Sequence, residues 1–73
     1  PSTTIRYSLS RTARVQLNVY DLAGRRIAVL VDGILASGEH TLQWNAEGAS
    51  SGVYLIRLES QGRVSTRSVI LAK

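Results

Sequence analysis

Residues 15–25 have the sequence VQLNVYDLAGR, which carries the clearest signal of the architecture of this chain. Its first half alternates apolar and polar side chains, which is the period-two pattern of a strand with one buried face. In its second half, Asp21 can accept hydrogen bonds from nearby backbone amides, and Gly24 can take a positive φ without steric cost. The stretch therefore predicts a strand and a tight turn that returns the chain into a neighbouring strand.

The same alternation recurs along the rest of the chain. Apolar residues occupy every second position of segments 5–9, 39–45 and 53–59, which predicts three further half-buried strands. Segment 26–32 is instead apolar at consecutive positions, which fits either a strand buried on both faces or a strand bent by a bulge. Segment 64–71 is rich in β-branched residues and predicts a last strand, whose inward face the pattern does not define.

Turn signals separate these segments. Residues 10–13 form a short polar connection suited to a hairpin, and residues 61–62 are the turn of another hairpin. We expect Gly33 and Gly38 to bracket a loop, and residues 46–52 to form an exposed loop that carries little packing. Short strands at this spacing suggest an all-β sandwich or barrel.

We therefore expect a single domain over residues 1–73, built as an all-β, two-layer antiparallel sandwich of about seven strands. A chain of 73 residues suits one domain, since domains commonly contain about 50–250 residues. The predicted core takes the inward-facing apolar residues of the alternating segments: Ile5, Leu9, Val15, Leu17, Val19, Leu42, Trp44, Tyr54, Ile56 and Leu58.

The composition excludes several classes of protein. Because the chain has no cysteine, it is not a disulfide scaffold, and it has neither a thiolate zinc site nor a cysteine nucleophile. The formal net charge is +4, but the nine basic residues are spread along the chain and only Arg25 and Arg26 are adjacent. The longest apolar run, residues 27–31, is far shorter than the ~20 residues of a membrane-spanning helix. We expect neither nucleic-acid binding nor membrane insertion.

Groups that could support catalysis or bind a cofactor are few. His40 is the single histidine, and it shares a strand face with Leu42 and Trp44, which predicts a ring packed on the sheet and hydrogen-bonded at its edge. The acidic residues sit mostly at expected turns and strand ends, and the serines at 50–51 lack the context of a nucleophile elbow. No glycine motif forms a phosphate-binding loop. The sequence predicts that the domain is not an enzyme and that it has no cofactor and no metal site.

A carbohydrate-binding surface would need several aromatic side chains on an exposed face. Tyr7, Trp44 and Tyr54 lie on faces predicted to be buried, and Tyr20 alone has outward parity. A single ring is a poor stacking platform for a sugar. Carbohydrate binding is therefore a less favoured hypothesis.

Several short motifs follow one another in a definite order. They are Ser2-Thr3-Thr4-Ile5 at the start, Tyr20-Asp21-x-x-Gly24-Arg25 at the first turn, Trp44 after Gly38, and Gly52-Val53-Tyr54 before the terminal strand. This order and spacing resemble the type A C-terminal sorting domain of cargo exported by the type IX secretion system. They are also similar to the immunoglobulin-like domain of the flagellar hook-capping protein. Sorting domains commonly carry Asn-Pro-Phe-Asn-Pro before the first motif, of which Pro1 alone is present, so we expect further sequence upstream.

The resemblance implies an immunoglobulin-like, non-catalytic domain that directs a larger cargo protein to the cell surface in Bacteroidota-type bacteria. The implied partners are an outer-membrane translocon, a sortase-like peptidase and a covalently linked upstream cargo domain, with export through the periplasm. The motif residues carried over are Tyr20, Asp21, Gly24, Arg25, Trp44, Gly52 and Tyr54. Translocon recognition is expected at the last strand, in particular at Val69, Ile70, Leu71 and Lys73.

Two other functions stay open. The domain could be a structural spacer or protein-interaction module, or, less favoured, a carbohydrate-binding module of a secreted enzyme. Its position in the full-length gene separates these hypotheses, because a terminal position favours sorting and an internal one favours a spacer.

Overall fold

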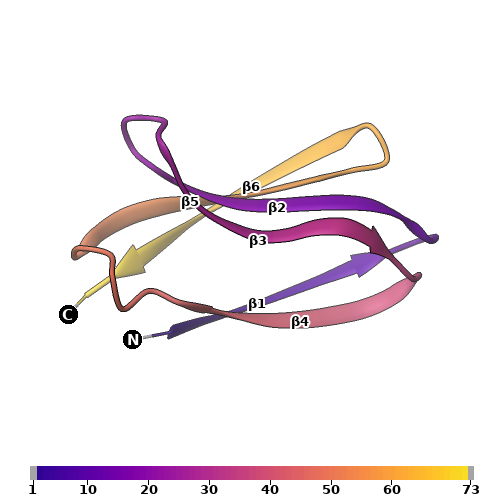
Figure 1. Ribbon diagram of the computed structural model, residues 1–73, viewed down its shortest axis with the longest axis horizontal. Helices are drawn as coiled ribbons and strands as arrows, with labels where there is room; N and C mark the ends of the chain where they lie inside the picture. Colours follow the sequence, from indigo (N-terminus) through magenta and orange to yellow (C-terminus); the bar gives the residue numbers. More distant parts are fainter. Residues whose placement is uncertain (1, 73) are drawn as a thin grey trace.

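The computed structural model describes residues 2–72, which form two antiparallel sheets packed face to face as a sandwich (Figure 1). One sheet has the strand order β1-β4 and the other has the order β3-β2-β5-β6. The strands are β1 (Ser2–Leu9), β2 (Ala13–Asp21), β3 (Arg26–Leu35), β4 (Gly38–Asn45), β5 (Gly52–Ser60) and β6 (Arg63–Leu71). The prediction of an immunoglobulin-like all-β sandwich is confirmed.

The strand count is six, and the prediction of about seven is corrected. Each predicted strand segment becomes one strand of eight to ten residues, and the connections between them within residues 2–72 contain no further strand. The loop expected between Gly33 and Gly38 is also shorter, because β3 continues through Gly33 to Leu35. Consequently the layer made by β1 and β4 is two strands wide and faces a layer of four.

The first connection is not a hairpin. β1 pairs with β4, whereas β2 pairs with β3 and β5, so the residues between Leu9 and Ala13 cross from one layer to the other. The hairpin prediction for residues 10–13 was wrong. A short polar link suits both a turn within a sheet and a step between sheets, and only the pairing of the flanking strands separates the two cases.

β3 is an edge strand with two bulges. Its pairing with β2 shifts register twice, which leaves Leu30 and then Ile27 without an opposing residue. Exposed fractions of 37% for Ile27 and 52% for Val29 show that the strand is not buried on both faces. Of the two structures that the consecutive apolar residues allowed, the bulged strand is the one observed.

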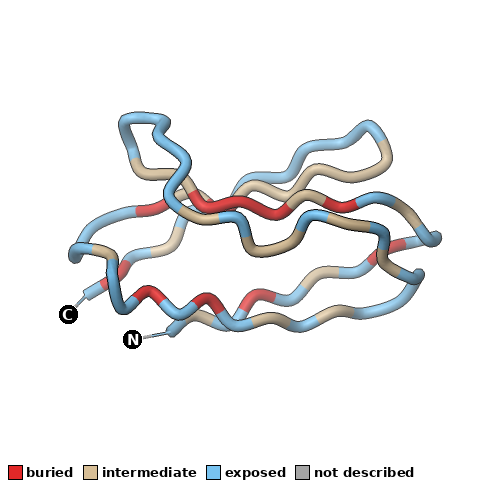
Figure 2. Tube along the Cα trace, in the orientation of Figure 1, coloured by how far each residue is buried: buried red, intermediate tan, exposed pale blue. Residues whose placement is uncertain are grey.

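The core agrees closely with the predicted set. Figure 2 shows its longest buried stretch on the central strand β2, where Leu17, Asn18 and Val19 are consecutive. Leu42 and Leu58 are half-buried and pack against the core from its margin. Two buried apolar residues were not predicted, Ala46 and Leu71, and neither was the buried polar residue Asn18. The buried apolar residues are Ile5, Leu9, Val15, Leu17, Val19, Trp44, Ala46, Tyr54, Ile56 and Leu71.

The last two strands form a regular hairpin. β5 and β6 pair over nine residues without a register shift, from Ser60 opposite Arg63 to Gly52 opposite Leu71. Gln61 and Gly62 form the predicted turn, and both have positive φ, 57° and 72°, as a type I′ turn requires. Because Ile56 faces the core, its partner Arg67 lies on the inner face of β6 as well.

Candidate functional site

The turn between β2 and β3 is built around one carboxylate. Asp21 Oδ1 accepts the Arg25 backbone N–H at 2.9 Å, and Asp21 Oδ2 accepts the Arg25 Nε–H at 3.1 Å. Gly24 has a φ of 87°, which a residue with a side chain adopts only with strain. The hydrogen bond from the Arg25 backbone N–H, assisted by the guanidinium charge, holds the pKa of Asp21 below its usual value. The sequence-based turn prediction is confirmed, and its cause is the fixed Asp21 carboxylate.

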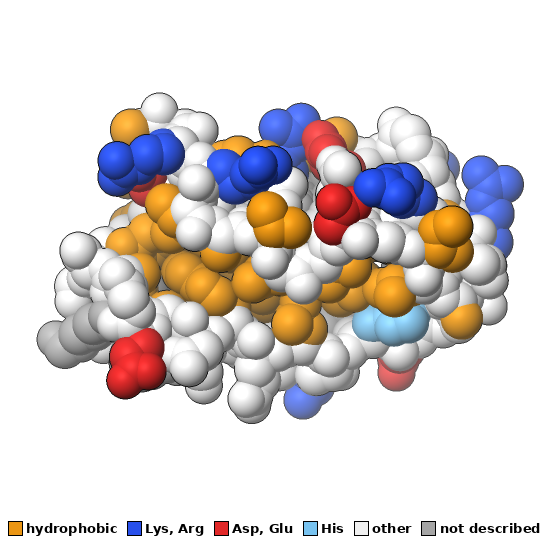
Figure 3. All heavy atoms as spheres, in the orientation of Figure 1, with side chains coloured by type: hydrophobic (Ala, Val, Ile, Leu, Met, Phe, Trp, Pro, Cys, Tyr) orange, Lys and Arg blue, Asp and Glu red, His pale blue; other side chains and the backbone are white. Residues whose placement is uncertain are grey.

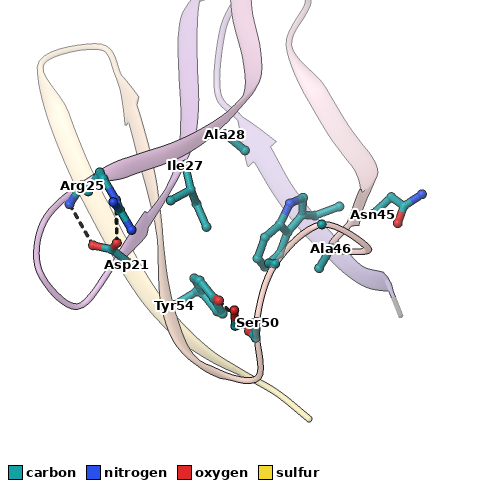
Figure 4. A pocket seen from close by; sticks show the side chains of 11 residues that line it. Asp21, Arg25, Ile27, Ala28, Asn45, Ala46, Ser50 and Tyr54 are labelled. Atoms are coloured by element: carbon teal, nitrogen blue, oxygen red, sulfur yellow. Dashed lines mark hydrogen bonds and ion pairs between the residues drawn. The ribbon is translucent and has the colours of Figure 1, made fainter. Parts of the chain in front are cut away.

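Trp44 and Tyr54 join the two layers next to this turn. Trp44 lies near the end of β4 and Tyr54 near the start of β5, and both side chains are buried. Their rings pack edge to face, with centroids 5.5 Å apart. The Tyr54 hydroxyl donates to the Ser50 carbonyl oxygen at 2.5 Å, so the same tyrosine also fixes the preceding loop (Figure 4).

These side chains line one groove of about 410 Å³ at the end of the sandwich where β1 begins and β6 ends (Figures 1 and 4). The groove brings together four of the predicted motif residues, Asp21, Arg25, Trp44 and Tyr54. Ile27 of β3 lines it as well. Figure 3 shows hydrophobic side chains along this seam between the layers, with charged side chains above them on the larger sheet.

The remaining motif residues lie outside the groove. Tyr20 is on the outer face of the larger sheet, where its hydroxyl accepts a long hydrogen bond of 3.4 Å from Asn18 Nδ2. Gly52 opens β5 with a φ of 156°, and a Cβ placed there would meet no heavy atom within 4 Å. The requirement for glycine at position 52 is thus one of backbone conformation rather than of close packing.

The loop after β4 contributes two side chains to the core, so the expectation of little packing was wrong at Ala46 and Ala49, while the other residues of 46–52 are exposed as expected. Ala46 is 1% exposed, and Ala49 packs against the core and donates its N–H to the Ala46 carbonyl at 3.0 Å. The sequence did contain a signal, because Ala46 continues the alternation of Leu42 and Trp44 by one more step. Ala46 belongs to the same core cluster as Trp44 and lines the same groove.

The predicted recognition residues on the last strand differ in how far their side chains are exposed. Ile70 points outward and is 78% exposed, whereas Leu71 is 5% exposed and belongs to the core. Val69 is half-buried against that core. Lys73 lies outside the described residues. Ile70 is therefore the one of these described residues whose side chain is fully available to a partner.

His40 takes the structural role that the sequence indicated. Its ring stacks on Tyr7 with centroids 5.4 Å apart, and its Nε2 is 2.8 Å from the Ala36 carbonyl oxygen. Within residues 2–72, no three His, Asp or Glu side chains are grouped closely enough to hold a metal ion. The same residues include no helix that is long and apolar enough to cross a membrane.

The fold and the site define a small immunoglobulin-like β-sandwich module whose signature residues build one turn, one interlayer contact and one groove. A family model described as the secretion system C-terminal sorting domain matches residues 2–72, and the chain belongs to this family. Domains of this family are C-terminal sorting signals for type IX secretion. Comparison with curated proteins gave no match, and neither did comparison with solved structures.

Proposed function

We propose that the domain carries a covalently attached cargo protein to an outer-membrane translocon, which recognises the free edge of β6. Export then passes through the periplasm to the cell surface or the extracellular space, where a sortase-like peptidase acts on the cargo. Membership of the sorting family supports the secretion step. The contrast between the two edges of the larger sheet supports β6 as the recognised element.

The two edge strands differ in their ability to accept another strand. β3 carries two register shifts, and bulges of this kind discourage pairing with a further strand. β6 has no register shift against β5, and its first six residues, 63–68, are all exposed. The regular β6 edge therefore suits β-augmentation, in which main-chain hydrogen bonds supply affinity and alternate side chains supply specificity.

The register identifies which backbone groups are available. The residues that flank a two-residue hairpin turn form a hydrogen-bonded pair, and such pairs alternate along an antiparallel ladder. Since Ser60 and Arg63 flank the turn, the N–H groups of Val64, Thr66, Ser68 and Ile70 point away from β5. Proline at position 66 would remove one outward N–H and leave the ladder to β5 intact.

The experiment is delivery of a fluorescent reporter fused to residues 1–73, behind an export signal, in a host with type IX secretion. We expect the wild-type fusion at the cell surface, and the Thr66→Pro and Ile70→Asp fusions retained in the periplasm. Ile34→Asp is the matched control, because Ile34 is 72% exposed on the opposite edge strand β3. Surface delivery is measured by protease accessibility of the reporter on intact cells.

Each outcome has a defined meaning. Surface delivery of Thr66→Pro and Ile70→Asp at the wild-type level would exclude recognition at β6. Retention of the wild-type fusion, in cells where another sorting domain delivers the same reporter, would favour the spacer function. Deleting residues 69–73 is the weaker test, because it removes Leu71 from the core together with the strand edge.

A further inference from the structure

A second groove opens on the side of the sandwich where β1 faces β6. Its deeper part has a volume of about 240 Å³ and is lined by one side of β1 and the inner face of β6. Ser8, Leu58 and Ser65 line this part and also an adjoining hollow toward the β5–β6 turn. The two parts together follow β1 from Thr3 to its end at Leu9 and reach Ser10 just beyond it.

The groove exists because the two layers differ in width. The layer of β1 and β4 cannot cover the inner face of all four strands of the other sheet, so apolar side chains beneath β5 and β6 line the opening. The apolar lining on the larger sheet comes from Leu17 of β2, Ile56 and Leu58 of β5, and Val69 of β6, and β1 adds Ile5 and Tyr7. β1 pairs with β4 on one side, and within residues 2–72 no strand pairs with its other side.

Three arginines give this groove its charge: Arg63 lines the adjoining hollow, and the other two line the deeper part. Arg6 of β1 and Arg67 on the inner face of β6 both line it, and both are exposed. Within residues 2–72 neither takes part in an ion pair, whereas Arg14, Arg25 and Arg57 each pair with a carboxylate. An opening with an apolar floor and two unpaired guanidinium groups is complementary to a ligand that combines apolar side chains with carboxylates.

We propose that this groove binds an extended acidic peptide as a third strand on the free edge of β1. Its inward side chains would be apolar and pack on Ile56 and Leu58. Its outward carboxylates would lie on the same sheet face as Arg6, and Arg67 would contribute positive charge from the opposite layer. β1 has eight residues, and each residue of a strand adds roughly 3.3 Å of length. A peptide strand that pairs along all of β1 would therefore also have about eight residues. This site uses a different strand edge from β6 recognition and does not depend on the proposed secretion role.

The test is fluorescence anisotropy with labelled nine-residue peptides and the 1–73 chain. We expect saturable binding of a peptide in which Val alternates with Glu, and no binding of peptides in which Val alternates with Lys or in which the Val and Glu residues are grouped in blocks. The double variant Arg6→Glu/Arg67→Glu should bind the first peptide at least about tenfold more weakly. Arg11→Glu/Arg26→Glu changes the net charge equally at exposed positions outside the groove and should bind as the wild type does.

Two further measurements locate the peptide. Ser65→Trp fills the groove from an exposed position and should abolish binding, while its urea denaturation midpoint stays near that of the wild type. Amide NMR shifts on binding should be largest along β1. The proposal would be overturned if the Val–Lys peptide bound as tightly as the Val–Glu peptide, or if no peptide bound. It would also be overturned if both double variants lost the same affinity, or if the largest amide shifts lay along β3. Dimerisation in sedimentation that Ser65→Trp abolishes would overturn it too, because a second copy would then be the occupant.

Discussion

The rings of Trp44 and Tyr54 meet edge to face, with centroids 5.5 Å apart and planes inclined by 72°. Trp44 belongs to the two-stranded sheet and Tyr54 to the four-stranded sheet, so this contact fastens the layers together. The loop between them closes over the contact through Ala46 and the Ser50 carbonyl. Trp44 and Tyr54, two of the predicted motif residues, therefore stabilise the packing of the two layers.

Trp44→Ala should cost about 3–5 kcal/mol, because it leaves a large cavity between the layers. Domains of this size rarely exceed about 3–5 kcal/mol in total stability, so circular dichroism should show a largely unfolded variant at 25 °C. Leu22→Ala is the control, since Leu22 is 68% exposed and its loss should change the stability by less than about 0.5 kcal/mol. A Trp44→Ala protein with a near-native urea midpoint would contradict the packing role.

Tyr54→Phe should destabilise the domain by about 0.5–1.5 kcal/mol, because it removes the hydroxyl that donates to the Ser50 carbonyl and keeps the ring against Trp44. Urea denaturation measures the change. In Tyr20→Phe the lost hydrogen bond is the long one of 3.4 Å, so the effect should be smaller. If Tyr54→Phe and Tyr20→Phe lowered the free energy of unfolding equally, the hydrogen bond to the Ser50 carbonyl would stabilise the domain no more than the long Asn18 contact does.

Asp21→Asn should lower the stability at pH 7 and remove part of its dependence on pH. The pKa of Asp21 is lower in the folded chain, so its stabilising effect is present above the unfolded value of about 4 and is lost as the pH falls through the folded value. The difference between the wild type and Asp21→Asn, measured by urea denaturation from pH 7 to pH 3, should shrink toward acid.

Arg25→Gln is the companion to this measurement. It keeps the backbone N–H, the main cause of the lowered pKa of Asp21, and removes only the guanidinium. Most of the pH dependence should therefore survive in Arg25→Gln. If that variant flattens the pH profile as much as Asp21→Asn does, the guanidinium charge is the principal cause instead.

Ala46→Leu should destabilise the domain by about 1–3 kcal/mol, because Ala46 is 1% exposed and belongs to the same buried core cluster as Trp44. Gly48→Ala, in the same loop, is the control, since Gly48 is exposed and has room for a Cβ. Thermal unfolding of the two variants compares them directly. If both variants unfolded at the wild-type temperature, the Ala46 side chain would contribute little packing, as the sequence suggested.

Gln61→Asn should stabilise the domain by about 0.5–1 kcal/mol. Gln61 has a φ of 57°, which asparagine adopts more readily, and Asn-Gly is the preferred pair for a type I′ turn. The buried Gln61 Nε2 also has no hydrogen-bond partner within residues 2–72. A rise in the urea midpoint would support this prediction, and a fall would show that the 3.4 Å contact from Ser10 Oγ to the Gln61 side chain matters more.

Local sequence patterns predicted all six strands and most of the core. Alternation identified four of the strands, whereas a consecutive apolar run identified β3 and β-branched residues identified β6. The Asp21 and Gly24 turn and the turn at residues 61–62 lie where local chemistry predicts them. Such features depend on neighbours within a few residues, because a strand face repeats every second position and a turn needs particular φ values. The sorting-family motif is likewise a local pattern, and the family match confirms it.

Only the tertiary structure decided which strands pair and how far each layer extends. Residues 10–13 suited a hairpin, yet β1 pairs with β4, some 30 positions later in the chain. Strand alternation specifies a buried face but not the strand beside it, because pairing depends on how distant hydrophobic faces close over one another. The packing of the two layers against each other buried Ala46 and Leu71 and left Leu58 at the margin of the core. It also left the β1–β6 groove open, because a two-strand layer covers only part of a four-strand layer.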